Sequence, residues 1–175
     1  MQKDIFVEKL VKRKKTGAEK LLSVMLILSA IFLIAFCFVL PIIVQVNFYV
    51  ISGLVSFGIG FLVYRMITSF NRDYEYSITN DELLIDQIIA ERKRSRVFIG
   101  SCKDFSIVAP ISGPDFKSQC EQGIFRLDFR SGEDDNAGWF FVTRRGGSTM
   151  MILFEPDDRF IAAFKKYIPR NVKTE

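Results

Sequence analysis

The sequence predicts a membrane α-helical hairpin followed by a small α+β soluble domain. Residues 21–64 contain no Asp, Glu, Lys, Arg or His. Short segments that alternate between apolar and polar residues follow between residues 73 and 154, and an amphipathic helical pattern begins at Pro156. About 100 residues remain after Arg72, which is enough for one domain with its own hydrophobic core.

The uncharged stretch is too long for a single membrane-spanning helix. Its 44 residues would form a helix of roughly 66 Å, whereas the hydrocarbon core of a bilayer is roughly 30 Å thick. Two spans joined by a tight connection therefore fit residues 21–66. The first span is expected to end at Leu40, because Pro41, Gln45 and Asn47 are typical of a turn, and Phe48 is expected to begin the second span.

The distribution of charge predicts the orientation of this hairpin. Residues 1–20 carry seven Lys or Arg and three Asp or Glu, whereas residues 65–175 carry 17 of each, so the net charge of +4 resides in the N-terminal segment. Cationic residues flank both ends of the hairpin and none lies in its connection. The positive-inside rule then places both termini in the cytoplasm of a cell-membrane protein. A nucleic-acid partner is not expected, because the soluble domain has no net positive charge.

Residues 1–20 form a basic segment for which two interpretations stand. Ile5, Phe6 and Leu10 recur at roughly helical spacing, which favours an amphipathic helix on the cytoplasmic headgroups. The alternative is an unstructured tail that holds the N-terminus in the cytoplasm. In either case, contact with anionic headgroups is expected from four consecutive cations, Lys12, Arg13, Lys14 and Lys15.

Small residues recur every four positions along the second span, at Ser52, Ser56 and Gly60. Small residues at this spacing let two helices approach closely, so we interpret them as packing residues within the hairpin, with a homodimer interface as the alternative. Neither span contains an ionisable residue of the kind that pumps and carriers need. The hairpin is therefore interpreted as an anchor rather than a transport path.

The soluble part, residues 72–170, reads as a series of short strands. Tyr74, Tyr76 and Ile78 alternate with polar residues, and the clearest alternation sets Phe125, Leu127 and Phe129 against Arg126, Asp128 and Arg130. Further strands are expected at 83–89, 97–99, 105–109, 139–143 and 149–154. Residues 112–122 read as a loop. Trp139, Phe140 and Phe141 are expected in the core.

The last pattern predicts a helix with agreeing start and stop signals. Pro156 suits the first helical position, Asp157 and Asp158 suit the positive end of the helix dipole, and Pro169 stops the helix. Its apolar stripe consists of Phe160, Ile161, Phe164, Tyr167 and Ile168. This stripe is expected to cover the open end of a barrel formed by the strands.

Strands first, an early basic hairpin and a final helix form the order of a pleckstrin-homology (PH)-like fold. The stretch YSITNDELLIDQIIAERKRSRVFIGSCKDFSIVAP, residues 76–110, resembles the opening of bacterial membrane-anchored PH-like domains. The resemblance implies a small antiparallel β-barrel or sandwich capped by the C-terminal helix, in a two-span membrane protein of unknown function. Residues 112–122 depart from that pattern as an insertion.

The most concentrated charge of the soluble domain is the run Arg92, Lys93, Arg94 and Arg96. An early basic hairpin in a PH-like domain implies contact with lipid headgroups or with a protein partner. The alternative is a solvated hairpin that is partly neutralised by Glu91. Strand alternation would send Arg92, Arg94 and Arg96 to one face and Lys93 to the other.

Catalytic, metal-binding and cofactor-binding residues are not predicted. The absence of histidine removes Ser-His and Cys-His nucleophile systems. The three cysteines show no metal-ligand spacing, and we interpret Cys102 and Cys120 as free thiols, with a disulfide between them as the alternative. Residues 133–135 lack the spacing of a calcium-binding EF-hand.

These observations predict a non-enzymatic, membrane-anchored interaction module. Two other functions remain open. The first is an accessory subunit that joins a larger membrane complex, or a homo-oligomer, through its transmembrane hairpin. The second is an enzyme that acts on lipids.

Overall fold

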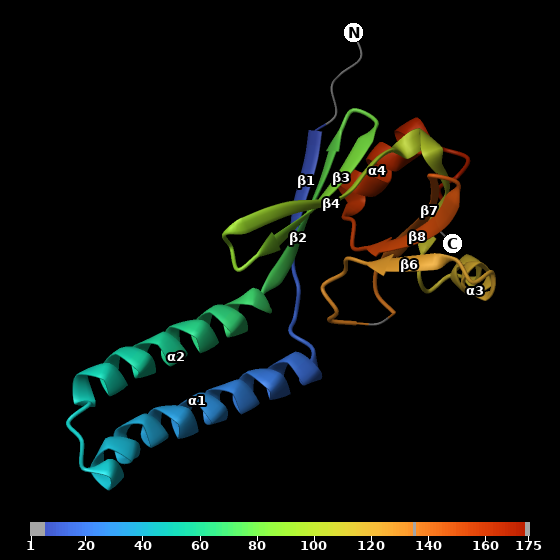
Figure 1. The fold of residues 1–175 in the computed structure, drawn as a ribbon. Helices are drawn as coiled ribbons and strands as arrows, with labels where there is room; N and C mark the ends of the chain where they lie inside the picture. Colours follow the sequence, from blue (N-terminus) through green and yellow to red (C-terminus); the bar gives the residue numbers. More distant parts are fainter. Residues whose placement is uncertain (1–5, 135, 174–175) are drawn as a thin grey trace. The chain divides into compact units, whose positions relative to one another are not determined.

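The computed structural model describes residues 6–134 and 136–173, and the chain divides into two compact units (Figure 1). One unit is the helical segment of residues 15–71. The other is a β-rich domain that combines the chain before this segment with the chain from Arg72 onward. The helical segment is therefore inserted into the domain, which resumes at Arg72 as expected. The expected range 72–170 is incomplete, because the domain also includes a strand before the helices.

The helical unit consists of α1 (Gly17–Val44) and α2 (Tyr49–Ser69). Both helices are long and apolar enough to cross a membrane. The prediction that Pro41 begins the turn is wrong, because α1 continues through this residue. A proline in the last turn removes only one backbone donor, and the end of the helix still closes through a 3.2 Å bond from the Val46 N–H to the Pro41 carbonyl.

The first sheet of the domain is antiparallel, with the strand order β1-β2-β3-β4. These strands are β1 (Phe6–Lys12), β2 (Arg72–Thr79), β3 (Glu82–Ile89) and β4 (Lys93–Ser101). The prediction of an amphipathic helix near the N-terminus is wrong for residues 6–12. These residues form a strand that pairs with β2 along its whole length. A separation of four residues, as between Phe6 and Leu10, fits one face of a strand as well as one face of a helix, so the spacing alone could not decide. Residues 1–5 of the expected helix lie outside the described residues.

The second sheet has the order β5-β7-β8-β6. It contains β5 (Phe105–Pro110), β6 (Phe125–Asp128), β7 (Trp139–Arg145) and β8 (Ser148–Phe154), and the short helix η1 (Cys102–Asp104) precedes it. The two sheets do not close into a barrel, and β6 runs parallel to β8 instead of antiparallel. The chain reaches this edge through α3 (Pro114–Glu121), so the loop predicted for residues 112–122 is wrong. Phe116 of α3 packs against Phe140, with ring centroids 5.4 Å apart, which gives the short helix an apolar contact.

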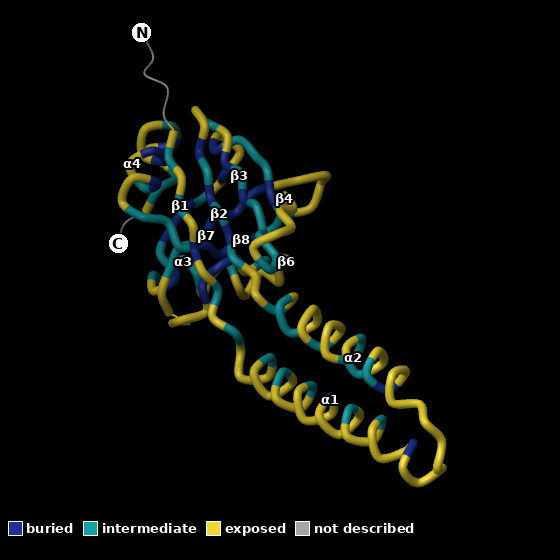
Figure 2. The backbone as a smooth tube through the Cα atoms, turned by 90° about the vertical axis from the view of Figure 1, so that its left-hand side faces the viewer, coloured by how far each residue is buried: buried dark blue, intermediate teal, exposed yellow. Residues whose placement is uncertain are grey.

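The main core lies between the two sheets and α4 (Asp158–Tyr167) (Figure 2). As predicted, Phe160, Phe164 and Ile168 are buried against the strands. The helix begins where the Asp157 carboxylate accepts hydrogen bonds from the Arg159 and Phe160 N–H groups, each 3.1 Å long. Phe140 and Phe141 are fully buried, as expected, whereas Trp139 is partly exposed. The three cysteines are free thiols, which confirms that Cys102 and Cys120 do not pair.

Candidate functional site

The basic run of residues 92–96 lies in the β3–β4 hairpin, where it is split between a turn and a strand. Arg92 closes a tight turn by donating its N–H to the Ile89 carbonyl over 3.1 Å. The two central residues of this turn, Ala90 and Glu91, have φ angles of 53° and 56°. The left-handed conformation costs an L-residue about 1–2 kcal/mol, and Asn-Gly is the pair that such turns favour. This turn therefore holds strain that a different sequence would relieve.

The two arginines of β4 are held by carboxylates on β2 and β3. Arg94 lies 2.8 Å from Glu75, and Arg96 lies 3.0 Å from Asp86. Burial raises the pKa of Glu75, the charge of Arg94 opposes this rise, and the nearby Glu8 adds to it. Both arginine charges are therefore matched within the domain, and the basic run does not act as one cationic patch.

Lys12 and Arg13 lie at the end of β1, beside the start of β2. Lys12 is exposed and lies opposite Asp73 in the strand register. The backbone N–H of Arg13 donates to Asp73 Oδ1 over 3.3 Å. Lys15 belongs to the helical unit, so the four consecutive cations are divided between the two units.

Lys14 is attached to the loop that follows β6. Its backbone N–H donates to the Ser131 carbonyl over 2.8 Å, and its ammonium group pairs with the carboxylate of Glu133. Glu133, in the acidic stretch of residues 133–135, is therefore a partner for one of the cations predicted to contact lipid. Residue 135 itself lies outside the described residues.

A pocket of about 340 Å³ brings parts of the two predicted basic clusters together at one end of the first sheet. Its lining residues come from β1, β2, β3, β4 and the strained turn: Leu10, Lys12, Asp73, Ile88, Glu91, Arg92 and Arg94. Lys93 and Arg96 do not line it. Strand pairing explains the assembly, because Lys12 lies opposite Asp73, Asp73 opposite Ile88, and Ile88 opposite Arg94.

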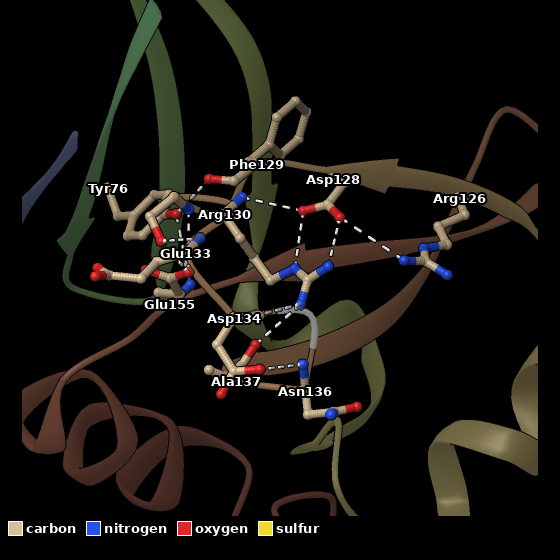
Figure 3. Close-up of polar contacts among 11 residues, drawn as sticks. Tyr76, Arg126, Asp128, Phe129, Arg130, Glu133, Asp134, Asn136, Ala137 and Glu155 are labelled. Atoms are coloured by element: carbon tan, nitrogen blue, oxygen red, sulfur yellow. Dashed lines mark hydrogen bonds and ion pairs between the residues drawn. The ribbon is translucent and has the colours of Figure 1, made fainter. Parts of the chain in front are cut away.

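Among the described residues of the domain, Arg130 has the most buried charged side chain, which is only 5% exposed. Figure 3 shows its polar contacts. Its guanidinium donates to both oxygens of Asp128, over 3.0 and 2.7 Å, and to the Ala137 carbonyl over 3.0 Å. Burial by itself raises the pKa of Asp128, but the hydrogen bonds and charge of Arg130 outweigh it and hold the pKa below its usual value. The sequence pattern placed Arg130 on a solvent face, and this prediction is wrong.

A second part of the same network joins β2 to the segment after β6. The Tyr76 hydroxyl donates to the Phe129 carbonyl over 2.6 Å, and burial raises the pKa of this tyrosine well above its usual range. The Ser131 N–H and hydroxyl both donate to Glu155 Oε1, over 3.0 and 2.8 Å. No motif in the sequence signals this network, because its members are far apart along the chain.

The small residues of α2 do not all serve the contact with α1. Ser52 is buried at this contact, whereas Gly60 is exposed. A side chain added at Gly53, Gly58 or Gly60 would meet no atom within 4 Å. Near the connection between the helices, Cys37, Pro41 and Ser52 help to line an apolar groove of about 410 Å³.

Among the described residues, no group of three or more His, Cys, Asp or Glu side chains is placed to hold a metal ion. Burial raises the pKa of the Cys102 thiol to about 12, so this thiol is not activated as a nucleophile.

Two sheets, a C-terminal helix and an inserted pair of apolar helices define a PH-like domain with a candidate membrane anchor. The family described as Bacterial PH-like domain (DUF6106) matches residues 3–174, so the chain belongs to this family. The matched range includes the helical insertion and both parts of the domain, and it confirms the resemblance drawn from the sequence. Searches of curated proteins and of solved structures found no match.

Proposed function

We propose that the helical pair crosses the cell membrane twice and anchors a non-catalytic PH-like interaction module at its cytoplasmic face. The observation that carries this proposal is the insertion of α1 and α2 between two paired strands. Since Lys12 lies opposite Asp73 in the sheet, both ends of the helical pair must return to one folded domain. An even number of crossings satisfies this requirement, whereas a single crossing does not.

The charges around the helices support the cytoplasmic side. Lys12, Arg13, Lys14, Lys15 and Lys20 precede the uncharged stretch, and Arg65 and Arg72 follow it. The connection between α1 and α2 carries no charge. Under the positive-inside rule, the domain faces the cytoplasm and the connection faces outward.

The short linkers support a role at the membrane surface. Four residues separate β1 from α1, and two separate α2 from β2. At roughly 3.5 Å per residue, the longer linker reaches no more than about 15 to 20 Å. One end of the first sheet carries both Lys12 and the β3–β4 turn. If the helices cross the membrane, the short linkers keep this end of the sheet within reach of the headgroups. Each cation near an anionic leaflet contributes about 1 kcal/mol.

The chain's own thiols provide the test of this topology. Cys120 is exposed on the domain and Cys102 is buried, so Cys120 reports on the domain's side of the membrane. With an impermeant maleimide, we expect Asn47→Cys to label in intact cells and Cys120 to label only after the cells are opened. A Cys120→Ser variant identifies the labelled position. Labelling of Cys120 in intact cells would overturn the assignment.

The second candidate function is assembly with other membrane proteins, or with a second copy, through the hairpin. The face of α2 that does not pack against α1 favours it. Gly53 and Gly60 have no neighbouring atoms within 4 Å at their Cβ positions. Such features favour close helix contact in a membrane.

Cross-linking of the full-length protein in membranes tests this second candidate. Gly60→Leu is expected to abolish a cross-linked complex, because it blocks close approach of another helix. Leu62→Ala is the matched control, since this exposed residue lies about 200° further around α2. Equal cross-linking in both variants and in the unchanged protein would exclude this face as the interface.

A further inference from the structure

The pocket at the end of the first sheet has walls of mixed charge. Lys12 enters from β1, Asp73 from β2, and Glu91 and Arg92 from the β3–β4 turn. Leu10 and Ile88 add apolar surface. Its ligand is therefore expected to combine polar groups with a short apolar part.

The sign of the unmatched charges narrows the class of ligand. Arg94 is already paired with Glu75. In the part of the chain that the structure describes, Lys12, Arg92 and Glu91 form no ion pair, and Asp73 accepts only a backbone hydrogen bond. Two cations and two carboxylates therefore remain, with no net charge.

This balance disfavours a ligand of one sign. A simple anion would be attracted by Lys12 and Arg92 but repelled by Glu91 and Asp73, and a simple cation would meet the reverse. A group that carries both a phosphate and an ammonium can place each charge beside its opposite. The apolar side chains of Leu10 and Ile88 suit the methylene groups that join the two charges.

The strained turn supports a role for these side chains. Ala90 and Glu91 occupy left-handed positions in which asparagine and glycine would be favoured. Strain of this kind is concentrated at binding sites, where the required side chain outweighs the backbone preference. Asn-Gly at this position would relax the turn but would remove the Glu91 carboxylate from the pocket.

We propose that this pocket binds a phosphoethanolamine group, that is, a phosphate joined by two methylenes to a primary ammonium. Lys12 and Arg92 hold the phosphate, and Glu91 and Asp73 hold the ammonium. The group comes either from a phosphatidylethanolamine headgroup or from free phosphoethanolamine. The lipid source rests on the proposed function, because only a membrane-anchored domain keeps the pocket within reach of headgroups.

Binding to the detergent-solubilised full-length protein tests the proposal. The probes are short-chain phosphatidylethanolamine, phosphatidylglycerol and phosphatidylcholine, together with free phosphoethanolamine. The readout is hydrogen-exchange protection of residues 88–94. We expect phosphatidylethanolamine to bind about tenfold more tightly than phosphatidylglycerol, since one extra charge-assisted contact is worth about that factor. Displacement of the lipid by free phosphoethanolamine would show that the polar group is sufficient, whereas lipid binding without displacement would assign the membrane as the source.

Variants separate the two halves of the site. Glu91→Gln is expected to remove the preference for phosphatidylethanolamine while binding of the phosphate persists. Arg92→Gln is expected to weaken the binding of all four probes, because each contains a phosphate. Arg96→Gln is the matched control, because Arg96 pairs with Asp86 and does not line the pocket. Unchanged thermal unfolding of Trp139 fluorescence shows that each variant is folded.

The binding and labelling experiments together distinguish the failure of this inference from the failure of the proposed function. Equal binding of the four probes, no binding of phosphatidylethanolamine, or an unchanged preference in Glu91→Gln overturns the pocket assignment even when the labelling of Cys120 and Asn47→Cys supports the anchor. Selective phosphatidylethanolamine binding together with Cys120 labelling in intact cells retains the pocket and overturns the cytoplasmic assignment.

Discussion

Replacing Arg130 with leucine is expected to lower the free energy of unfolding of the domain by about 3–5 kcal/mol. The guanidinium is almost completely buried and holds both oxygens of Asp128 and the Ala137 carbonyl. Its removal leaves a partly buried carboxylate and a backbone carbonyl without their donor. The single tryptophan, Trp139, lies in the domain, so thermal unfolding of the full-length protein in detergent can be followed by its fluorescence. For a domain of this size, we expect the Tm to fall by more than about 10 °C.

Arg126 provides the matched control for this substitution. It lies 3.7 Å from the same Asp128, but its side chain is 46% exposed. Arg126→Leu is therefore expected to change stability by less than about 1 kcal/mol. Substituting both Arg130 and Asp128 with leucine should recover part of the loss, because no buried charge is then left without a partner. Equal losses in Arg130→Leu and Arg126→Leu would contradict a structural role for the buried pair.

Replacing Val11 with aspartate is expected to destabilise the domain by about 3–5 kcal/mol, because it places an unpaired charge in the core. Val11 is only 5% exposed and belongs to the core formed with β2 and α4, although the helical insertion separates it from the rest of the domain along the chain. The same fluorescence measurement reports the loss. Limited proteolysis should show earlier cleavage within the domain.

Phe6→Asp is the control within the same strand. Phe6 is 67% exposed, so this substitution should change the Tm by only a few degrees. An amphipathic helix at the membrane surface predicts the opposite order, because Phe6 would then be a membrane contact. Loss of membrane contact in Phe6→Asp together with unchanged stability in Val11→Asp would contradict the pairing of β1 with β2.

The sequence alone was sufficient for the features that depend on local chemistry. Two apolar helices follow from the absence of charge over residues 21–64. The C-terminal helix follows from the acidic residues at its start, the proline after its end and its apolar stripe, although Pro156 precedes the cap and does not take the first helical position. The alternation around Tyr76 predicted the buried face of β2. The same local information placed Arg92, Arg94 and Lys12 among the candidate contacts, three of the seven side chains that line the pocket.

The tertiary structure decided the features that depend on partners distant in the chain. Residues 6–12 form a strand because β2, some 60 residues later, supplies the backbone partners that an isolated segment lacks. The charge of the pocket likewise depends on residues of β2. Glu75 pairs with Arg94 of β4, and Asp73 adds a carboxylate to the pocket wall. Arg130 is buried because Asp128 and the turn ending at Ala137 close around it. Local periodicity determines the secondary structure of a segment when its pattern fits only one kind of element. Where the pattern fits more than one, strand pairing and ion pairing with distant residues determine the structure that forms.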